Sequence, residues 1–162
     1  EVVNAGTSVV GGSGNDTLSF ANGATSVSIS GGLGKDVVTF SGAQVANSTV
    51  DLGSDTDLFT LTIGASASTI LGGANNDTLV FTGQGLTTSS ISGGDGNDSI
   101  SISFELTSGN SINGGAGNDE IEVGSIDDLI YGGSSGDVIT GRCGSDTICG
   151  QAGADQIAGS GD

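Results

Sequence analysis

The sequence predicts an all-β protein, a parallel β-solenoid in which short strands wind into stacked coils. Three observations predict this fold: similar glycine-rich strings recur along the chain, apolar and polar residues alternate after each string, and no segment shows helical periodicity. The composition agrees, because 32 of the 162 residues are glycine and only five are phenylalanine, so the large side chains of an ordinary globular core are scarce.

An aspartate that closes a glycine-rich loop marks each repeat, as in GGSGND at residues 11–16. Successive markers are 20, 21, 20, 21 and 21 residues apart, and then 9 residues apart four times. The markers are Asp16, Asp36, Asp57, Asp77, Asp98, Asp119, Asp128, Asp137, Asp146 and Asp155. We therefore expect one solenoid over residues 1–162, with long repeats at 1–113 and tandem nonapeptides at 114–162. Neither end has the polar cap that solenoids need, so we expect a fragment of a longer chain or a unit that stacks end to end.

A first strand is predicted after each loop. Two residues beyond each marker stands an apolar residue: Leu18, Val38, Phe59, Leu79, Ile100, Ile121, Ile130, Ile139, Ile148 and Ile157. The long repeats carry a second apolar residue two positions later: Phe20, Phe40, Leu61, Phe81, Ile102 and Val123. Alternation with a period of two is typical of a strand with one buried side.

A second strand is predicted before each loop of the long repeats. Its inward residues are Val9, Ile29, Val50, Ile70, Ile91 and Ile112, and each follows an outward residue from the row Ser8, Ser28, Thr49, Thr69, Ser90 and Ser111. A plainer turn, such as NGATS at 22–26, joins the two strands of a long coil, whereas two nonapeptides fill one coil of 18 residues. Stacked at about 4.8 Å, about seven and a half coils make a rod about 36 Å long.

The two edges of this rod are expected to differ. Loops that begin at residues 11, 31, 52, 72, 93, 114, 132 and 150 each follow one coil after the previous one, so they stack on one edge. The opposite edge has plain turns until residue 123, and only Asp128 and Asp146 form a short second row there.

The charge balance points to cations as partners. The chain has 19 acidic residues and a formal net charge of −17, and Lys35 and Arg142 are its only basic residues. Nucleic acid and anionic membranes carry the same sign as the protein, so we expect neither as a partner. No apolar run reaches the about 18 residues of a membrane span, so no membrane insertion is expected. Self-association of rods, end to end or laterally, is a further expectation.

The loops have the chemistry of calcium sites, with the ten marker aspartates as candidate ligands. Glycine tolerates positive φ, and we expect Asn15, Asn76, Asn97 and Asn118 to be left-handed too, so that each loop turns tightly and directs carbonyl oxygens inward. Hard oxygen ligands suit Ca²⁺. Zinc and copper would lack their preferred ligands in a chain with no histidine and only two cysteines.

Four strings carry a family resemblance: GGSGND (11–16), GGLGKD (31–36), GGDGND (93–98) and GGAGND (114–119). Together with the tail GRCGSDTICGQAGADQIAG, they resemble the GGxGxD nonapeptide of the repeat-in-toxin (RTX) proteins. The resemblance implies a right-handed parallel β-roll in which loop carbonyls and aspartates of successive coils hold several Ca²⁺ ions. It also implies secretion, usually by the type I route, because such modules occur in toxins, proteases, lipases, adhesins and surface-layer proteins.

Three loops depart from this motif, and their metal occupancy stays open. LGSDTD (52–57) and VGSIDD (123–128) each replace two glycines, and GGANND (72–77) replaces one. Their aspartates are either weaker ligands or only turn formers. Phosphate binding is not expected, because the loops end in aspartate, lack a P-loop lysine and open no helix.

Cys143 and Cys149 lie in one nonapeptide. With one in a turn and the other at the far end of the next strand, their Cα atoms should lie beyond the about 7 Å that a disulfide spans. An internal disulfide is therefore disfavoured, and free thiols or an intermolecular bond remain open.

No enzyme is expected, because the chain has no histidine and no paired nucleophile and base. The favoured function is a calcium-dependent structural segment of an extracellular bacterial surface protein, such as a surface layer, filament or adhesin stalk. The alternative is the secretion and folding module of a toxin or hydrolase, and the tandem nonapeptides favour it. A third class is a ligand-binding adhesin face. Ice binding is disfavoured there, because no loop carries threonine at its third position.

Overall fold

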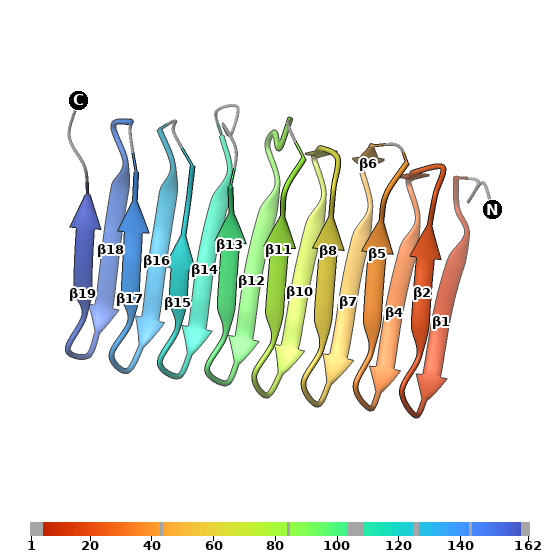
Figure 1. Cartoon of the computed structure of the whole chain (residues 1–162), viewed down its shortest axis with the longest axis horizontal. Coiled ribbons are helices and arrows are strands. Elements are labelled where there is room, and N and C mark those ends of the chain that lie inside the picture. Colours follow the sequence, from red (N-terminus) through yellow and green to blue (C-terminus); the bar gives the residue numbers. More distant parts are fainter. Residues whose placement is uncertain are drawn as a thin grey trace.

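The structure is a computed structural model that describes residues 5–42, 44–83, 85–103, 109–124, 127–142 and 144–159. These residues form the predicted all-β fold, in which parallel strands stack as a β-solenoid (Figure 1). Among them there is no helix, and hence none that is long and apolar enough to cross a membrane.

Two 8-stranded parallel sheets run the length of the solenoid. The first sheet contains the strands that precede the glycine loops: β1 (Ser8–Ser13), β4 (Ser28–Leu33), β7 (Thr49–Ser54), β10 (Thr69–Ala74), β12 (Ser90–Asp95), β14 (Ser111–Ala116), β16 (Leu129–Ser134) and β18 (Thr147–Ala152). The second sheet contains the strands that follow them: β2 (Thr17–Phe20), β5 (Val37–Phe40), β8 (Leu58–Leu61), β11 (Thr78–Phe81), β13 (Ser99–Ile102), β15 (Glu120–Glu122), β17 (Val138–Gly141) and β19 (Gln156–Gly159).

Each coil repeats its neighbour position by position. In the first sheet Gly12 pairs with Gly32, Gly32 with Gly53, and Gly53 with Gly73. The offset between paired residues is 20 or 21 as far as Asp119 and 18 beyond it. The eight glycine loops that begin at residues 11, 31, 52, 72, 93, 114, 132 and 150 therefore lie on one edge of the rod, as the spacing predicts.

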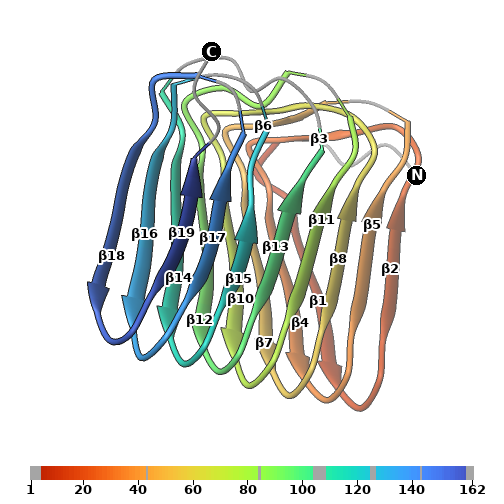
Figure 2. The ribbon, with the colours of Figure 1, turned by 60° about the vertical axis from the view of Figure 1, so that its left-hand side comes forward.

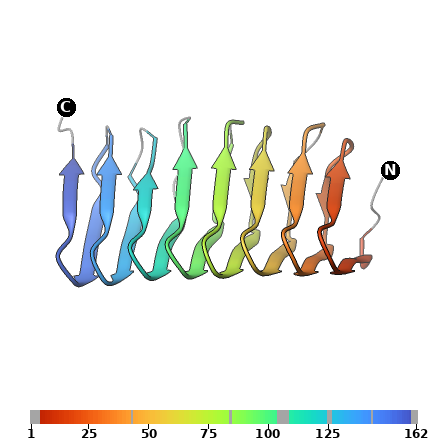
Figure 3. The same cartoon turned by 60° about the horizontal axis from the view of Figure 1, so that its bottom comes forward.

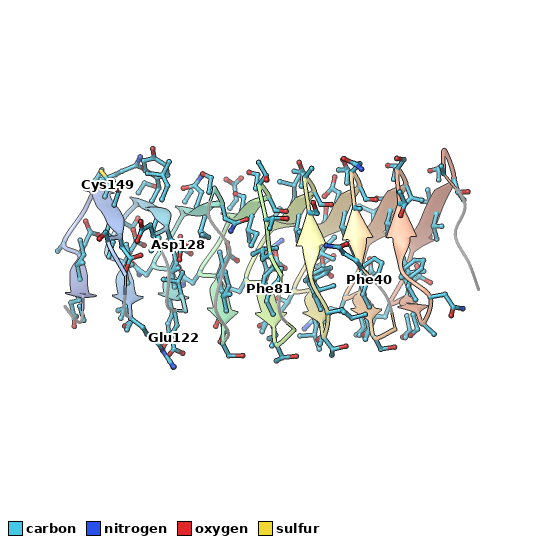
Figure 4. The ribbon with its side chains drawn as sticks, turned by 90° about the horizontal axis from the view of Figure 1, so that it is seen from above. Phe40, Phe81, Glu122, Asp128 and Cys149 are labelled. Atoms are coloured by element: carbon cyan, nitrogen blue, oxygen red, sulfur yellow. The ribbon has the colours of Figure 1, made fainter. Side chains whose placement is uncertain are left out.

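The core is a set of ladders between the two sheets. Most residues of the inward rows expected from the alternation are buried, and Ile29, Val50, Ile70 and Ile91 are examples with no more than 1% exposure. Phenylalanine rings contact one another along the second sheet: Phe20 and Phe40 stack with centroids 4.7 Å apart, and tilted pairs follow at 5.9 Å for Phe40 and Phe59 and 5.4 Å for Phe59 and Phe81. Figure 4 shows Phe40 and Phe81 among the side chains of this half of the rod. Large apolar side chains thus fill a thin core without a layer of helices.

The edge opposite these glycine loops contains a third sheet, which the sequence pattern did not predict. Its strands are β3 (Ala24–Thr25), β6 (Val45–Ala46) and β9 (Ala65–Ser66), and a bridge from Ser66 to Thr87 extends it (Figure 2). Ala24, Val45, Ala65 and Leu86 are buried beneath this edge. Two-residue strands are too short to show alternation, which explains why only a turn was expected.

The core becomes smaller toward the C-terminal end of the described chain. Ile148 is only partly buried against the core, and Ile157 is 50% exposed. Ile157 continues the inward row, because it pairs in register with the buried Ile139, and it is exposed because β19 is the outer strand of its sheet among the described residues.

Replacement of Phe59 tests the importance of the aromatic ladder. Phe59→Ala removes a ring with 0% exposure that makes tilted contacts with two other rings, so we expect a loss of about 3–5 kcal/mol in the free energy of unfolding. Leu58→Ala is the matched control, because Leu58 precedes it on β8 and is 37% exposed; its cost should be about 1 kcal/mol or less. Urea denaturation in saturating Ca²⁺ measures the free energy of unfolding of both variants. Equal losses would contradict the inward position of Phe59 and the outward position of Leu58 on β8.

Candidate metal site

The glycine loops join each strand of the first sheet to the next strand of the second sheet. They form one continuous edge, at the bottom of Figure 1 and turned toward the viewer in Figure 3. We call this the loop edge, and the opposite edge the plain-turn edge. The loop edge brings Asp16, Asp36, Asp57, Asp77, Asp98, Asp119, Asp137 and Asp155 into one row, as each marker accepts a hydrogen bond from the previous one or donates one to the next.

Positive φ at the second and fourth loop positions explains the glycines there. Gly12 and Gly14 in the first loop have φ of 112° and 103°. A Cβ on the stacked Gly32 would lie 2.1 Å from the carbonyl oxygen of Gly12, so neighbouring coils exclude any side chain. Where glycine is replaced at the fourth position, Asp55, Asn75 and Ser135 also adopt positive φ. Asparagine and aspartate tolerate this region better than most residues.

The expectation for the loop asparagines was wrong. Asn15, Asn76, Asn97 and Asn118 are not among the residues with positive φ. Their side-chain oxygens instead accept hydrogen bonds from the backbone of neighbouring coils, for example from Lys35 N to Asn15 Oδ1 at 3.0 Å and from Asn118 N to Asn97 Oδ1 at 2.8 Å. Stacking of coils decides this role, and a single loop sequence does not reveal it.

The aspartate row is linked by hydrogen bonds from coil to coil. The backbone N–H of each aspartate donates to Oδ1 of the aspartate one coil further on, without a break from Asp16 to Asp155. The N···Oδ1 distances range from 2.7 Å at Asp36 to 3.1 Å at Asp137. Each carboxylate therefore holds two coils in register through one of its oxygens.

The other carboxylate oxygen is buried and has no hydrogen-bond partner within the described chain. This holds for Oδ2 of Asp16, Asp36, Asp57, Asp77, Asp98, Asp119 and Asp137. Most of these residues are no more than 2% exposed. A buried carboxylate oxygen without a partner costs free energy, so each loop needs a cation or a proton at this place.

The first glycine of each loop makes room for this oxygen. A Cβ on Gly93 would lie 2.2 Å from Asp98 Oδ2, and a Cβ on Gly31 would lie 2.4 Å from Asp36 Oδ2. The carboxylate thus folds back beneath its own turn, into space that only glycine leaves open. Leu52 and Val123 stand at this position in two of the irregular loops, and both are fully buried.

Burial raises the pKa of the carboxyls in the row. Desolvation is the main cause, and the charges of neighbouring aspartates add to it. The pKa of Asp77 rises to about 7, and those of Asp57 and Asp119 rise to about 6, while those of Asp98 and Asp137 also rise. The metal-free row therefore resists full ionisation at neutral pH.

A short second row lies on the plain-turn edge, as predicted. Asp128 N donates to Asp146 Oδ1 at 3.1 Å, and Ser145 N donates to Asp127 Oδ1 at 2.8 Å. Both carboxylate oxygens of Asp128 are buried and without a partner in the described residues, and burial followed by the charges of Asp146 and Asp127 raises its pKa to about 7. Asp128, labelled in Figure 4, lines a cleft of about 370 Å³ together with Asn110 and Asp127.

The donor set fits Ca²⁺ when the backbone is included. No group of three acidic or cysteine side chains in the described parts of the chain is close enough to hold a metal ion alone. A site between two loops must therefore combine the aspartate carboxylates with backbone carbonyls of the glycine turns. Calcium accepts six to eight oxygen ligands of both kinds, and the unpartnered Oδ2 atoms are carboxylate ligands of the required chemistry.

Of the two cysteines, the structure describes only Cys149, and Cys143 lies outside the described residues. Cys149 is an exposed free thiol in β18, and it pairs in register with Tyr131 of β16. The expected separation of the two cysteines thus stays a prediction.

The irregular loop at residues 52–57 generates a prediction about calcium affinity. We expect Asp98→Ala to lower calcium affinity more than Asp57→Ala, because Asp98 lies in a loop with all three glycines and shares a site with the equally regular loop at 114–119. Leu52 replaces the first glycine of the loop of Asp57 and is buried, which should already weaken the sites of that loop. Isothermal titration calorimetry of both variants measures the difference, and an equal or larger loss for Asp57→Ala would contradict it.

The raised pKa values predict that acid stabilises the metal-free fold. The folded protein binds more protons than the unfolded chain between the ordinary aspartate pKa near 4 and the folded value of about 7 for Asp77. The stabilisation is therefore complete below about pH 4 and is lost as the pH rises through 7. Circular dichroism in excess chelator should show more β structure at pH 5 than at pH 8. Asp77→Asn should reduce this dependence, and a loss of β signal on acidification to pH 5 would contradict it.

Comparison with known proteins agrees with this geometry. The family described as the RTX calcium-binding nonapeptide repeat (4 copies) matches residues 8–27, 64–84, 89–101, 107–125 and 122–157. Neither the curated proteins nor the solved structures contain a match. The matched segments make up more than half of the chain and contain most of the stacked glycine loops. The chain therefore belongs to the RTX family, whose nonapeptide repeats bind calcium.

Proposed function

We propose that this chain is a calcium-dependent structural β-solenoid of an extracellular bacterial surface protein, such as a surface layer, a filament or an adhesin stalk. It folds on Ca²⁺ binding after secretion and has no catalytic role. The observation that carries this proposal is the row of buried aspartates whose Oδ2 atoms have no partner among the described residues. The ligands we assign are the eight aspartates of the loop edge with Asp128 and Asp146.

Electrostatic repulsion supports coupling between calcium binding and folding. Coils stacked about 4.8 Å apart hold neighbouring carboxylates at a similar distance. Each ionised pair then costs about 1 kcal/mol at the dielectric constant of water and several times more near a protein surface. Calcium between the loops replaces this repulsion with attraction, so binding free energy becomes folding free energy.

The difference in calcium concentration across the cell envelope supports folding outside the cell. Extracellular calcium modules bind with dissociation constants on the order of 10⁻⁴ to 10⁻³ M, far above the calcium concentration of the cytosol. The chain would stay unfolded inside, in a form suited to type I secretion, and would fold in millimolar calcium outside. RTX repeats occur in proteins secreted by this route, which agrees with the proposal.

The regular surface supports a structural role. The outer residues of the first sheet include Ser28, Thr49, Ser90 and Thr147, all exposed, in a row of hydroxyl side chains that Leu129 interrupts between Ser111 and Thr147. Small hydroxyl side chains keep both the spacing and the solubility of a long sheet. A rod with such a surface transmits force or sets distances, and self-association, end to end or laterally, would extend it.

The second candidate is the secretion and folding module of a toxin or hydrolase. The tandem nonapeptides favour it, because they place glycine loops on both edges from residue 127 onward. Antibody labelling of intact cells separates the two functions. A surface protein stays on the cell in millimolar calcium, whereas a toxin or hydrolase appears in the medium with a catalytic domain attached.

Calcium removal tests the coupling of folding to metal. We expect circular dichroism of the chain at pH 7.5 to gain strong β signal on addition of millimolar Ca²⁺ and to lose most of it in excess EDTA. Magnesium at the same concentration is the ion control, and it should have much less effect because it requires tight octahedral geometry and releases its water reluctantly. Full β signal in EDTA would refute calcium-driven folding.

A further inference from the structure

A second ladder of inward polar residues runs along the plain-turn edge. It occupies the position just before each strand of the first sheet, and its members are Ser48, Ser68, Ser89, Asn110, Asp128 and Asp146. The first four are 2% or 3% exposed. We call Ser48, Ser68, Ser89 and Asn110 the serine ladder. It is the structural counterpart of the aspartate row, because both rows precede a strand and face the interior.

The serine ladder uses the same backbone hydrogen bond as the aspartate row. Ser48 N donates to Ser68 Oγ at 3.3 Å, Ser68 N donates to Ser89 Oγ at 3.3 Å, and Ser89 N donates to Asn110 Oδ1 at 3.0 Å. The rung before them runs from Val27 N to Ser48 Oγ at 3.2 Å. The backbone N–H just before each of these strands thus donates to a side-chain oxygen one coil further on.

The two rows differ in whether protein atoms satisfy the remaining hydrogen-bonding capacity of the side chain. Each serine hydroxyl also donates to a carbonyl of its own turn: Ser48 Oγ to Ala46 O at 2.7 Å, Ser68 Oγ to Ser66 O at 2.9 Å, and Ser89 Oγ to Thr87 O at 2.9 Å. A hydroxyl accepts and donates, so it is satisfied by protein atoms alone. An ionised carboxylate only accepts, which leaves its second oxygen in need of a cation.

The serine ladder ends where carboxylates begin on the same edge. Asn110 Nδ2 donates to Leu86 O at 3.0 Å, so the last amide of the ladder is also bonded to the protein. The next residue in the row is Asp128, with both carboxylate oxygens buried and unpartnered among the described residues. From this coil on, both edges carry carboxylates.

The apolar core changes at about the same point. The contacting rings of Phe20, Phe40, Phe59 and Phe81 all lie before residue 103. After residue 127, the buried apolar side chains of the core are Ile130 and Ile139, and Ile148 is only partly buried against it. Less buried apolar area means less stabilisation that is independent of metal.

We propose that the solenoid responds to calcium with a polarity along its length. The serine ladder is a clamp that needs no cation, and it holds the plain-turn edge between residues 27 and 110 when calcium is low. Residues 127–159 depend on calcium at both edges and therefore lose their structure first. This inference rests on the proposed calcium-dependent folding and adds where in the chain that dependence is greatest.

Hydrogen exchange of the full chain during a calcium titration tests this polarity. We expect backbone amides of residues 127–142 and 144–159 to lose protection at a higher free Ca²⁺ concentration than those of residues 44–83. Loss of protection at one common concentration, or first in residues 44–83, would overturn the proposal. Equal protection of all residues in calcium and in EDTA would instead refute calcium-driven folding itself, so the two failures are distinguishable.

Matched serine variants test the ladder directly. Ser89→Ala removes the acceptor of Ser68 N, so residues 44–83 should lose protection at a calcium concentration about twofold higher than in the unmodified chain. Ser90→Ala is the control, because Ser90 is the next residue and is exposed on β12; it should not shift the midpoint. Equal shifts in both variants, or none in Ser89→Ala, would overturn the role of the ladder.

A reciprocal change supplies a second measurement on the other part of the chain. Asp128→Ser places a hydroxyl where the carboxylates begin on the plain-turn edge. We expect residues 127–142 to keep protection at lower calcium than in the unmodified chain, and the number of bound Ca²⁺ ions at saturation to fall. Increased calcium dependence of these residues would contradict the proposal.

Discussion

Register stacking is the constraint on which the rest of this molecule depends. Because each coil repeats the previous one in unbroken parallel register, every residue faces a copy of its own position about 4.8 Å away. Stacking of like on like is favourable for valine, isoleucine and phenylalanine, which form the core ladders. It is unfavourable for aspartate, and the loop edge consists of aspartates. The row of buried, unpartnered carboxylate oxygens follows from applying one geometric rule to a charged residue.

At the two edges, different side chains accept the same kind of hydrogen bond from the backbone. At each edge, an N–H at the entry to a strand needs an acceptor from the next coil. Aspartate provides one on the loop edge, and serine provides one on the plain-turn edge as far as Ser89. The aspartate bond is charge-assisted but leaves a buried oxygen that requires a cation. The serine bond is weaker, yet it leaves no unsatisfied atom. Metal dependence is thus a property of individual positions, and the fold itself does not impose it.

Glycine makes it possible for an aspartate carboxylate to lie beneath the turn of its own loop. The first loop glycine leaves space for the aspartate beneath the turn, and the second, as at Gly32, lies too close to the backbone of the neighbouring coil for a Cβ. Leu52 replaces a first glycine and is fully buried, yet Asp57 of the same loop keeps its place in the row and its unpartnered Oδ2. A loop can therefore lose this glycine and gain apolar contacts without a change of register.

The sequence by itself determined the fold class, the two strands of each coil, the rows of inward apolar residues and the edge on which each glycine loop lies. These features follow from spacing and alternation, which are local and repeat many times, so an error in one coil is corrected by the others. The marker aspartates from Asp16 to Asp155 were found in this way.

Only the tertiary structure decided which atoms meet between coils. Contacts across 18 to 21 residues determine that Asn15 and Asn97 accept hydrogen bonds instead of adopting left-handed backbone, and that aspartate Oδ2 atoms stay without a partner. The same contacts reveal the serine ladder and the two-residue strands of the third sheet, whose members look like ordinary turn residues in the sequence. A side chain in a solenoid acquires its partner from the next coil, and the local sequence does not specify which of its atoms that coil will use.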